Sequence, residues 1–515
     1  MTAPRTPQDQ QEVIAFLSDP ASYTPAPERV ERMETHCAYI FLAGTQAWKI
    51  KRAVRLSYLD FSTLQQRRAA CEREVEINRI TAPDLYLGVV PICRAGDGSL
   101  SFGGPGEAVE WAVHMKRFDQ EALLDSMARR GALPLSLMVP LADHIAAYHA
   151  RAPVRRSRDG RATAALEAVV GSVAQALSNA PDYGSALKRA FVAARALLEE
   201  RERAGHVRRC HGDLHLRNIV VLNGKPVLFD AIEFDEQIAT IDVLYDLAFL
   251  LMDLWHRAKR RHANLVLNRY LWREGSEETL AGLRLMPLFL SLRAGVRAMV
   301  ASDRLAQLSG RARAPVRDEM ESYLASARRF LQPAAPRLVG VGGLSGTGKS
   351  TLAAGLAPEI GAPPGAVHLR SDVERKLLFG KSPEAPLDAG AYTPEISRTV
   401  YARLYEKAAI ALAAGRSVIV DAVFARPGER AALAQTARAA SAPFTGLWLE
   451  ADPALLKRRV AQRHGDASDA GPEVVEEQTG YDVGEIDWHR LDASGSQAQT
   501  HAAAMAALEA DRRAD

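Results

Sequence analysis

The stretch that decides the fold of the C-terminal part is GLSGTGKS, residues 343–350. It matches the complete pattern G-x-x-x-x-G-K-[ST], in which the backbone amides of a Gly-rich turn cradle phosphates at a helix N-terminus. The apolar run LVGV at 338–341 precedes it and TLAAGLA at 351–357 follows it. The motif therefore lies between an expected strand and an expected helix, as it requires, and predicts a nucleotide-binding loop.

The residues that we expect to hold the nucleotide lie in this loop and at the start of its helix. Lys349 would reach the β- and γ-phosphates, and the hydroxyl of Ser350 would bind Mg²⁺. The full set of expected cofactor-binding residues here is Gly343, Ser345, Gly346, Thr347, Gly348, Lys349, Ser350 and Thr351.

Strand and helix patterns alternate along the chain beyond residue 337. Expected strands cover 338–341, 367–369, 418–420 and 445–449, and expected helices cover 349–357, 395–414, 428–440 and 453–463. Such alternation predicts a parallel sheet covered by helices.

The run LRSDVER at 369–375 follows one of these strands, at the edge where α/β sheets bind ligands. Asp372 could take the proton of an acceptor hydroxyl, and Arg375, three residues on, could hold a polar or anionic substrate group. The alternative is that Ser371 or Asp372 only caps a helix. The sequence leaves both readings open.

Two further segments complete the expected second site. VIVD at 418–421 resembles a Walker-B strand, which would bring Asp421 near Mg²⁺. KRRVAQR at 457–463 and the following HGDASDA predict a mobile lid. Arg459 and Arg463, four residues apart on one helical face, could stabilise charge on a transferring phosphoryl group.

An unrelated motif, HGDLHLRN at 211–218, lies in the first half of the chain. Asp213 and Asn218 have the Asp-x4-Asn spacing of a kinase-type catalytic loop, in which the Asp accepts or orients the proton of an incoming hydroxyl. His211 is expected to support the loop rather than to react.

A tight hairpin is expected directly after this motif. IVVL at 219–222 and KPVLF at 225–229 flank Asn-Gly, the favoured pair of a two-residue type I′ turn. Pairing outward from the turn sets Asn218 opposite Phe229 and beside Asp230. An amide oxygen and a carboxylate oxygen there are suited to Mg²⁺ on ATP phosphates.

A kinase of this type also needs a strand Lys for the phosphates and a helix acid that pairs with it. Lys49 and Lys51 are two apart on one expected strand and so share a face, and either could be that Lys. Glu72, Glu74 and Glu76 on the following helix are the candidate partners. The segment where a Gly-rich phosphate loop would precede Lys49 reads ETHCA, residues 34–38, without glycine.

Composition narrows the classes of function. The net charge of +3 over 515 residues is too small to indicate nucleic-acid binding. The four cysteines form no CxxC pair and fit no metal or disulfide framework, which favours a reducing cytoplasm. The N-terminus has no signal-peptide core, and no segment reaches the roughly 20 apolar residues of a membrane span.

The first motif, with YLDFSTL at 58–64 and FDAIEFD at 229–235, resembles the aminoglycoside phosphotransferase-like family over roughly residues 30–330. The resemblance implies a two-lobed, protein-kinase-like fold with Asp213 as catalytic Asp and Asn218 and Asp230 as metal ligands. The longer runs resemble a bacterial branch in which this domain is fused to a P-loop ATPase.

The second part, roughly residues 337–500, resembles the small P-loop kinases of the AAA_33 and zeta-toxin-like group, which are similar in architecture to gluconate kinase and adenylate kinase. The Ser-Asp-x-x-Arg element and the DASDA run carry this likeness. The group implies phosphorylation of a small-molecule hydroxyl.

We therefore expect a multidomain chain of α+β and α/β class. A kinase-like domain would cover 1–331, with an N-lobe at about 30–118 and a helical C-lobe at about 119–331. Its strands are expected at 37–43, 47–51, 89–93 and 109–116, with a helix at 64–79. Residues 332–337, QPAAPR, would form a linker to a P-loop domain at 338–515.

The leading hypothesis is a cytoplasmic, bifunctional enzyme that uses ATP and Mg²⁺ to phosphorylate hydroxyl groups of small molecules at two sites. One alternative is a P-loop kinase regulated by a catalytically weak N-terminal domain that senses a ligand or partner. A third is a mechanical AAA-type ATPase, which is disfavoured because little chain follows residue 500 to form a helical lid domain.

Overall fold

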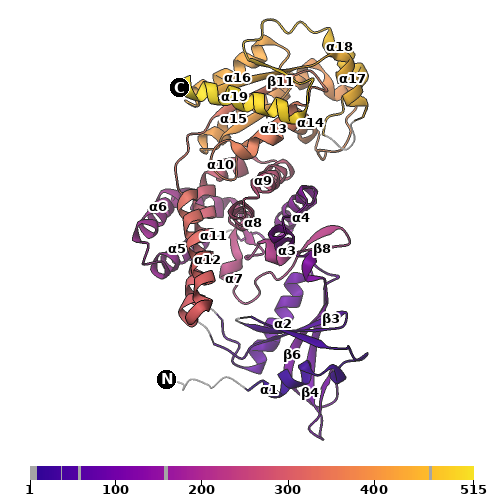
Figure 1. The fold of residues 1–515 in the computed structure, drawn as a ribbon, viewed down its shortest axis with the longest axis vertical. Helices are drawn as coiled ribbons and strands as arrows, with labels where there is room; N and C mark the ends of the chain where they lie inside the picture. Colours follow the sequence, from indigo (N-terminus) through magenta and orange to yellow (C-terminus); the bar gives the residue numbers. More distant parts are fainter. Residues whose placement is uncertain (1–8, 36, 56–58, 156–159, 463–466, 515) are drawn as a thin grey trace. The chain divides into compact units, whose positions relative to one another are not determined.

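The computed structural model describes residues 9–514 apart from residues 36, 56–58, 156–159 and 463–466 (Figure 1). The chain forms two compact units. The first comprises Met1–Leu141, Arg151–Ala165 and Glu202–Asp246, and the second comprises Ala142–Ala150, Leu166–Arg201 and Leu247–Asp515. Because this division runs through the helical region, the domain boundary expected at 332–337 stays a prediction. Residues 331–337 belong to no helix or strand.

The first unit contains an antiparallel six-stranded sheet in the order β1-β2-β3-β6-β4-β5. The four expected strands are confirmed. The sequence analysis missed β1, which is charged and half exposed, and β5, which is three residues long. The strands are β1 (Val30–Glu34), β2 (Ala38–Ala43), β3 (Gln46–Lys51), β4 (Tyr86–Arg94), β5 (Leu100–Phe102) and β6 (Glu107–Lys116).

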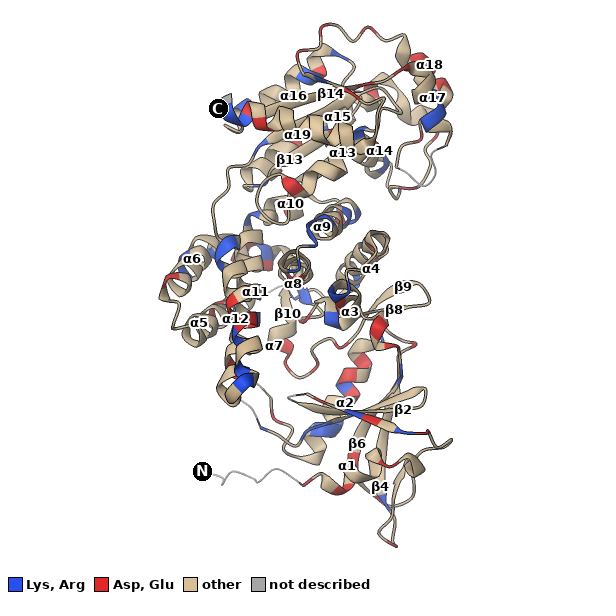
Figure 2. Cartoon of the chain, in the orientation of Figure 1, with Lys and Arg blue, Asp and Glu red and all other residues tan. Residues whose placement is uncertain are grey.

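Helix α2 (Leu64–Asn78) begins at Thr63, whose hydroxyl accepts from the Gln66 amide in a capping box. The helix carries residues of both charge signs (Figure 2). One of them, Arg67, is fully buried and its Nε lies 2.9 Å from Glu110 Oε1 of β6. Gln10 Nε2 donates to the other Glu110 oxygen at 2.7 Å. This buried pair fixes the rotation of α2 against the sheet.

The catalytic-loop motif lies between β7 (Val207–Arg209) and a hairpin of β8 (Ile219–Leu222) and β9 (Lys225–Leu228). Ile219 pairs with Leu228 and Leu222 with Lys225, so the expected register is confirmed. Asn223 and Gly224 have φ of 51° and 75°, as a type I′ turn requires. Strand β10 (Thr240–Asp242) pairs antiparallel with β7.

Long helices make up the rest of the kinase-like region. They include α9 (Arg260–Glu274), α11 (Met286–Gln307) and α12 (Arg313–Phe330). By length and composition alone, the stretch Glu277–Gln307 could cross a membrane, but 67% of its most apolar window is buried inside the protein, as in a core helix. The other α-helices here are α3 (Leu124–Arg129), α4 (Met138–Arg151), α5 (Arg161–Ala176), α6 (Pro181–Ala204), α7 (Glu236–Ala239), α8 (Val243–His256) and α10 (Glu277–Gly282).

A five-stranded parallel sheet in the order β12-β13-β11-β14-β15 forms the P-loop region, covered by helices (Figure 1). The α/β class expected from the alternating pattern is confirmed. Its strands are β11 (Leu338–Gly343), β12 (Val367–Arg370), β13 (Val418–Asp421), β14 (Phe444–Glu450) and β15 (His489–Asp492).

The helices around this sheet follow the expected segments and add three that the periodicity did not indicate. Helix α14 directly follows β12, and α18 and α19 lie beyond the expected lid. Strand β15 was also missed, since three of its four residues are exposed and polar. The helices are α13 (Lys349–Leu356), α14 (Ser371–Leu378), α15 (Pro394–Ala413), α16 (Pro427–Ala439), α17 (Pro453–Ala461), α18 (Pro472–Thr479) and α19 (Gln497–Ala514).

The buried pair under α2 generates a stability prediction. Glu110→Gln would leave the Arg67 guanidinium buried with only part of its compensation, at a cost of about 3–5 kcal/mol. Glu72→Gln removes an exposed partner of Arg68 on the same helix and should cost less than about 1 kcal/mol. Native-state hydrogen exchange of the α2 and β6 amides measures both values. Equal effects of the two substitutions would contradict the assigned role.

Candidate active sites

The P-loop is held in place by two close approaches of backbone. A Cβ on Gly343, which has φ of 135°, would lie 2.5 Å from the carbonyl oxygen of Leu449 on β14. A Cβ on Gly346, with φ of 86°, would lie 2.7 Å from the carbonyl oxygen of Leu456 on α17. Only glycine fits at these positions, and the loop is thereby clamped at the carboxyl edge of the sheet.

A cavity of about 1380 Å³ opens over this loop. It brings together most of the residues that the sequence analysis assigned to the second site. Among the predicted residues that the structure describes, Gly343 is the exception: it does not line the cavity, and it shapes the turn. The predicted residues that line the cavity are Ser345, Gly346, Thr347, Gly348, Lys349, Ser350, Thr351, Asp372, Arg375, Asp421 and Arg459.

Ser350 and Asp421, the two expected Mg²⁺ ligands, are joined by a side chain that the sequence analysis missed. Arg370 Nη2 donates to Ser350 Oγ at 3.0 Å, and Arg370 Nε lies 3.5 Å from Asp421 Oδ2. Burial raises the pKa of Asp421, but the His368 contact and the charges of Arg370 and Lys349 outweigh it and bring that pKa to about 2. The ionised Asp421 carboxylate and the Ser350 hydroxyl are oxygen ligands of the kind that Mg²⁺ prefers, and both already contact one positive charge, that of Arg370.

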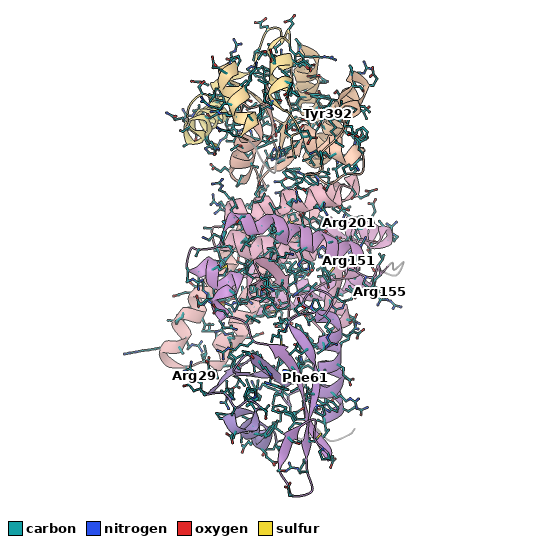
Figure 3. The ribbon with its side chains drawn as sticks, turned by 90° about the vertical axis from the view of Figure 1, so that its right-hand side faces the viewer. Arg29, Phe61, Arg151, Arg155, Arg201 and Tyr392 are labelled. Carbon is teal, nitrogen blue, oxygen red and sulfur yellow. The ribbon has the colours of Figure 1, made fainter. Side chains whose placement is uncertain are left out.

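Asp372 lies in the first turn of α14. The N-cap position belongs to Arg370, whose side chain makes no capping hydrogen bond, so neither Ser371 nor Asp372 is the N-cap residue of this helix. Arg375 is buried; it donates to the Ala391 carbonyl at 2.7 Å and to Ser397 Oγ at 3.3 Å. Its guanidinium also lies 4.8 Å from the ring centroid of Tyr392 (labelled in Figure 3).

The expected lid segment and helix α18, which follows it, both contact residues that line this cavity. Gln478 Oε1 on α18 accepts from the P-loop amide of Ser345 at 2.7 Å. Asp469 accepts from the Tyr392 hydroxyl at 2.6 Å and pairs with the buried Lys376 at 3.0 Å. Arg459 on α17 lines the cavity, whereas Arg463 lies outside the described residues.

The kinase-like site in the first unit centres on Lys49. Its ammonium lies 2.8 Å from Glu74 Oε1 and 2.7 Å from Asp230 Oδ1. Glu74 is therefore the helix acid, while Glu72 and Glu76 are exposed and pair with arginines of their own helix. Burial raises the pKa of Glu74, but the charges of Lys49 and Lys51 outweigh it and bring that pKa to about 2.

Lys51 shares this face of β3, as expected, but has a different environment. It is fully buried, lies 2.6 Å from Glu74 Oε2 and also pairs with Glu233. Because Lys49 contacts the candidate metal ligand Asp230 and Lys51 does not, the geometry selects Lys49 as the phosphate-binding candidate.

Asp213, Asn218 and Asp230 meet at the open end of the hairpin as the register predicted. Asn218 Nδ2 donates to Asp213 Oδ2 at 2.9 Å, which leaves its amide oxygen to face a cation. Asp230 adopts φ of 60° and presents its carboxylate to Lys49. An amide oxygen and a carboxylate oxygen are a donor set that fits Mg²⁺.

The catalytic loop itself is held by His211 and Asp246. The Asp246 carboxylate accepts from the amides of His211 and Gly212 at 3.1 and 2.8 Å. His211 Nε2 lies 2.9 Å from the Phe229 carbonyl oxygen, and burial lowers the pKa of its imidazole. Its contacts are those of a supporting residue.

The turn between β1 and β2 is short and lacks glycine. Thr35 and Ala38 close it by a backbone hydrogen bond of 2.9 Å. Cys37 lies close enough to Lys49, Lys51 and Asp230 for their charges to act on its thiol, whose pKa is raised by burial. The strand, the Lys and the acid are present here, whereas the connection between β1 and β2, in which residue 36 lies outside the described part of the chain, contains none of the glycines of a phosphate-covering loop.

Two families match the chain. Residues 54–282 match the family described as "Phosphotransferase enzyme family", and residues 338–481 match the AAA_33 family, described as "AAA domain". The "Uncharacterized protein Rv2004c" of Mycobacterium tuberculosis (strain ATCC 25618 / H37Rv) is 32% identical over 484 residues, which cover 90% of this chain and 93% of that protein. The "Uncharacterized protein Mb2027c" of Mycobacterium bovis has the same identity and coverage.

Several solved structures match parts of the chain at low similarity. A choline/ethanolamine kinase family protein from Mesorhizobium loti is 15% identical, covers 63% of this chain and 95% of its own, and has a TM-score of 0.36. A gluconokinase from Sinorhizobium meliloti 1021 is 20% identical, covers 35% and 94%, and has a TM-score of 0.26. The chain belongs to the same family as the mycobacterial proteins, and it is a kinase-class enzyme in which an aminoglycoside phosphotransferase-like domain is fused to an AAA_33 P-loop domain.

Proposed function

We propose that the chain is a bifunctional kinase that transfers the γ-phosphoryl group of ATP to hydroxyl groups of small molecules at two separate sites. The observation that carries the proposal is the cavity in which the P-loop, Asp421 and Asp372 face one space. At about 1380 Å³ it exceeds the ~300–1,000 Å³ typical of a site for one small ligand. It therefore has room for a nucleotide and a second small substrate.

At this P-loop site, backbone amides and Lys349 would bind and orient the phosphates, and Ser350 and Asp421 would hold Mg²⁺, which neutralises phosphate charge when bound. Asp372, in the first turn of α14, would orient the acceptor hydroxyl and take its proton. Arg459 would stabilise the charge that develops on the transferring group. Arg375 is the candidate for binding a polar group of the acceptor.

At the kinase-like site, Lys49, held by Glu74, would bind ATP phosphates, and Asn218 and Asp230 would hold Mg²⁺. Asp213 would orient the acceptor hydroxyl. We place both activities in the cytoplasm, where ATP is abundant, and we expect neither nucleic acid nor a membrane as partner.

A second candidate function concerns the kinase-like domain alone. The lack of glycine between Thr35 and Ala38 and the buried Lys51–Glu233 pair favour a domain that binds a ligand or partner and regulates the P-loop kinase. Nucleotide would then bind weakly at Lys49, and phosphoryl transfer would occur at the P-loop site only.

The first prediction concerns independence of the two sites. In the full chain, Lys349→Ala should lower calorimetric ADP binding from two nucleotides per chain to one, because the P-loop loses its phosphate-binding charge. Thr351→Ser, a conservative change in the same loop, should keep both. Loss of all binding in the Lys349 variant would contradict two separate sites.

The second prediction separates the kinase and sensor readings of the kinase-like domain. Asp213→Asn should remove one class of labelled products when the full chain is incubated with γ-labelled ATP and a deproteinised metabolite extract. A lost general base lowers turnover by about 10²–10⁴-fold, and the melting temperature should stay unchanged. If the set of labelled products is identical to that of the wild type, the sensor reading is correct.

The third prediction assigns Asp372 to chemistry. Asp372→Ala should remove the other class of labelled products, by about 10²-fold or more, while Mg²⁺–ADP affinity stays within about threefold. Asp388→Ala is the matched control, since Asp388 is exposed and does not line the cavity. Full transfer by the Asp372 variant would show that the acceptor site lies elsewhere.

A further inference from the structure

Arg370 is the last residue of β12 and the N-cap of α14, and the analysis of motifs did not single it out. It is only 8% exposed, and in the sheet its backbone pairs with Asp421 at the end of β13. A guanidinium at this depth is costly unless charged or polar partners surround it. Its partners include the two residues that the proposed function assigns to Mg²⁺.

The contacts of Arg370 form a bridge across the metal position. On one side its Nη2 donates to Ser350 Oγ at the start of α13, at 3.0 Å. On the other side its Nε lies 3.5 Å from Asp421 Oδ2. A fixed positive charge thus contacts both the hydroxyl and the carboxylate that would hold a metal ion.

Helix α9 supports this bridge from outside the sheet. Trp272 Nε1 donates to the His368 carbonyl at 2.9 Å, and its ring centroid lies 5.8 Å from the Arg370 guanidinium. Asn268 Oδ1 accepts from the His368 amide at 2.7 Å, while Asn264 and Asn268 donate to the Ala366 carbonyl at 3.0 and 3.1 Å. These hydrogen bonds attach the edge strand β12 to α9. They thereby fix the backbone position from which the Arg370 side chain extends.

The Arg370 guanidinium and a Mg²⁺ ion are both cations that can bind oxygen atoms. A guanidinium is permanently charged, and its planar fork suits phosphate oxygens as well as carboxylates. A Mg²⁺ ion held by Ser350 and Asp421 would compete with the guanidinium for the same two side chains. Because the guanidinium donates to Ser350, which lines the cavity, its positive charge lies one hydrogen bond away from the space in which phosphates would bind.

We propose that Arg370 is an internal cation that takes the metal position between Ser350 and Asp421, supports nucleotide binding in the absence of Mg²⁺, and yields that position to the Mg²⁺–nucleotide complex. This inference rests on the proposed nucleotide function of the P-loop site. The competing explanation is that Arg370 only neutralises the buried Asp421. In that case its loss would affect metal-free and metal-loaded binding equally.

The test is calorimetric ADP binding by the full chain, in EDTA and in excess Mg²⁺, counting only the binding that Lys349→Ala abolishes. Arg370→Gln keeps hydrogen-bonding capacity but removes the charge. It should raise the Kd for ADP in EDTA about tenfold or more, and change the Kd for Mg²⁺–ADP by less than about threefold. Arg370→Lys keeps the charge and should preserve metal-free affinity within about threefold.

Arg398→Ala is the matched control, because Arg398 also lines the cavity but is exposed and pairs with Glu395, three residues earlier on the same helix. It should leave the ratio of the two dissociation constants unchanged. If Arg370→Gln raises the Kd in EDTA and the Kd in Mg²⁺ by the same factor, or changes neither, the inference is overturned.

The wild type provides a measurement that does not depend on folding of any variant. Wild-type chain that binds Mg²⁺–ADP at the P-loop but no ADP in EDTA also overturns the inference. Wild-type chain that binds ADP at the P-loop under neither condition contradicts the proposed nucleotide function instead, so the two failures are distinguishable.

Discussion

The parallel pairing of β11 with β13 and β14 is the constraint on which the P-loop site depends. It sets Val341 beside Asp421 on one side and Gly343 beside Leu449 on the other. Because all strands run the same way, their carboxyl ends meet at one edge, and the P-loop, Asp421 and Leu449, which are far apart in the chain, face one cavity. A slip of this register by one residue would turn Asp421 to the other face of the sheet and remove it from Ser350.

The two sites have different folds but share one electrostatic feature, a cationic side chain paired with a buried carboxylate. Each holds a cation, Lys49 or Arg370, against a carboxylate that is nearly or fully buried, Glu74 or Asp421. A buried pair of this kind contributes little net stability, but it fixes the direction of each charge before a ligand arrives. Catalysis by positioning and electrostatics benefits from such fixed charges, since they need no reorganisation when phosphate charge develops.

Features with a local signal could be predicted from the sequence. The Asn-Gly turn set the hairpin register, the two-residue period of a strand put Lys49 and Lys51 on one face, and the P-loop pattern marked its own turn. Features set by tertiary packing could not. The choice of Glu74 over its neighbours depends on the rotation of α2, which the distant Arg67–Glu110 pair fixes. Gln478 reaches Ser345 across 133 positions, and no local pattern signals that contact. An Arg before Ser-Asp is typical of a solvated helix start, so Arg370 was missed.

The side-chain amides of α9 have a consequence for how this chain can be divided. Within the described part of the chain, the outer edge of β12 pairs with no other strand of the sheet. Its backbone groups at Ala366 and His368 form hydrogen bonds instead with the side chains of Asn264, Asn268 and Trp272. A fragment beginning at the linker would lack α9 and would present this edge to solvent. An uncovered sheet edge can pair with a strand of another chain, so such a fragment should self-associate. Fusion of the two domains therefore also protects the P-loop sheet against aggregation, because it supplies the helix that covers the edge of β12.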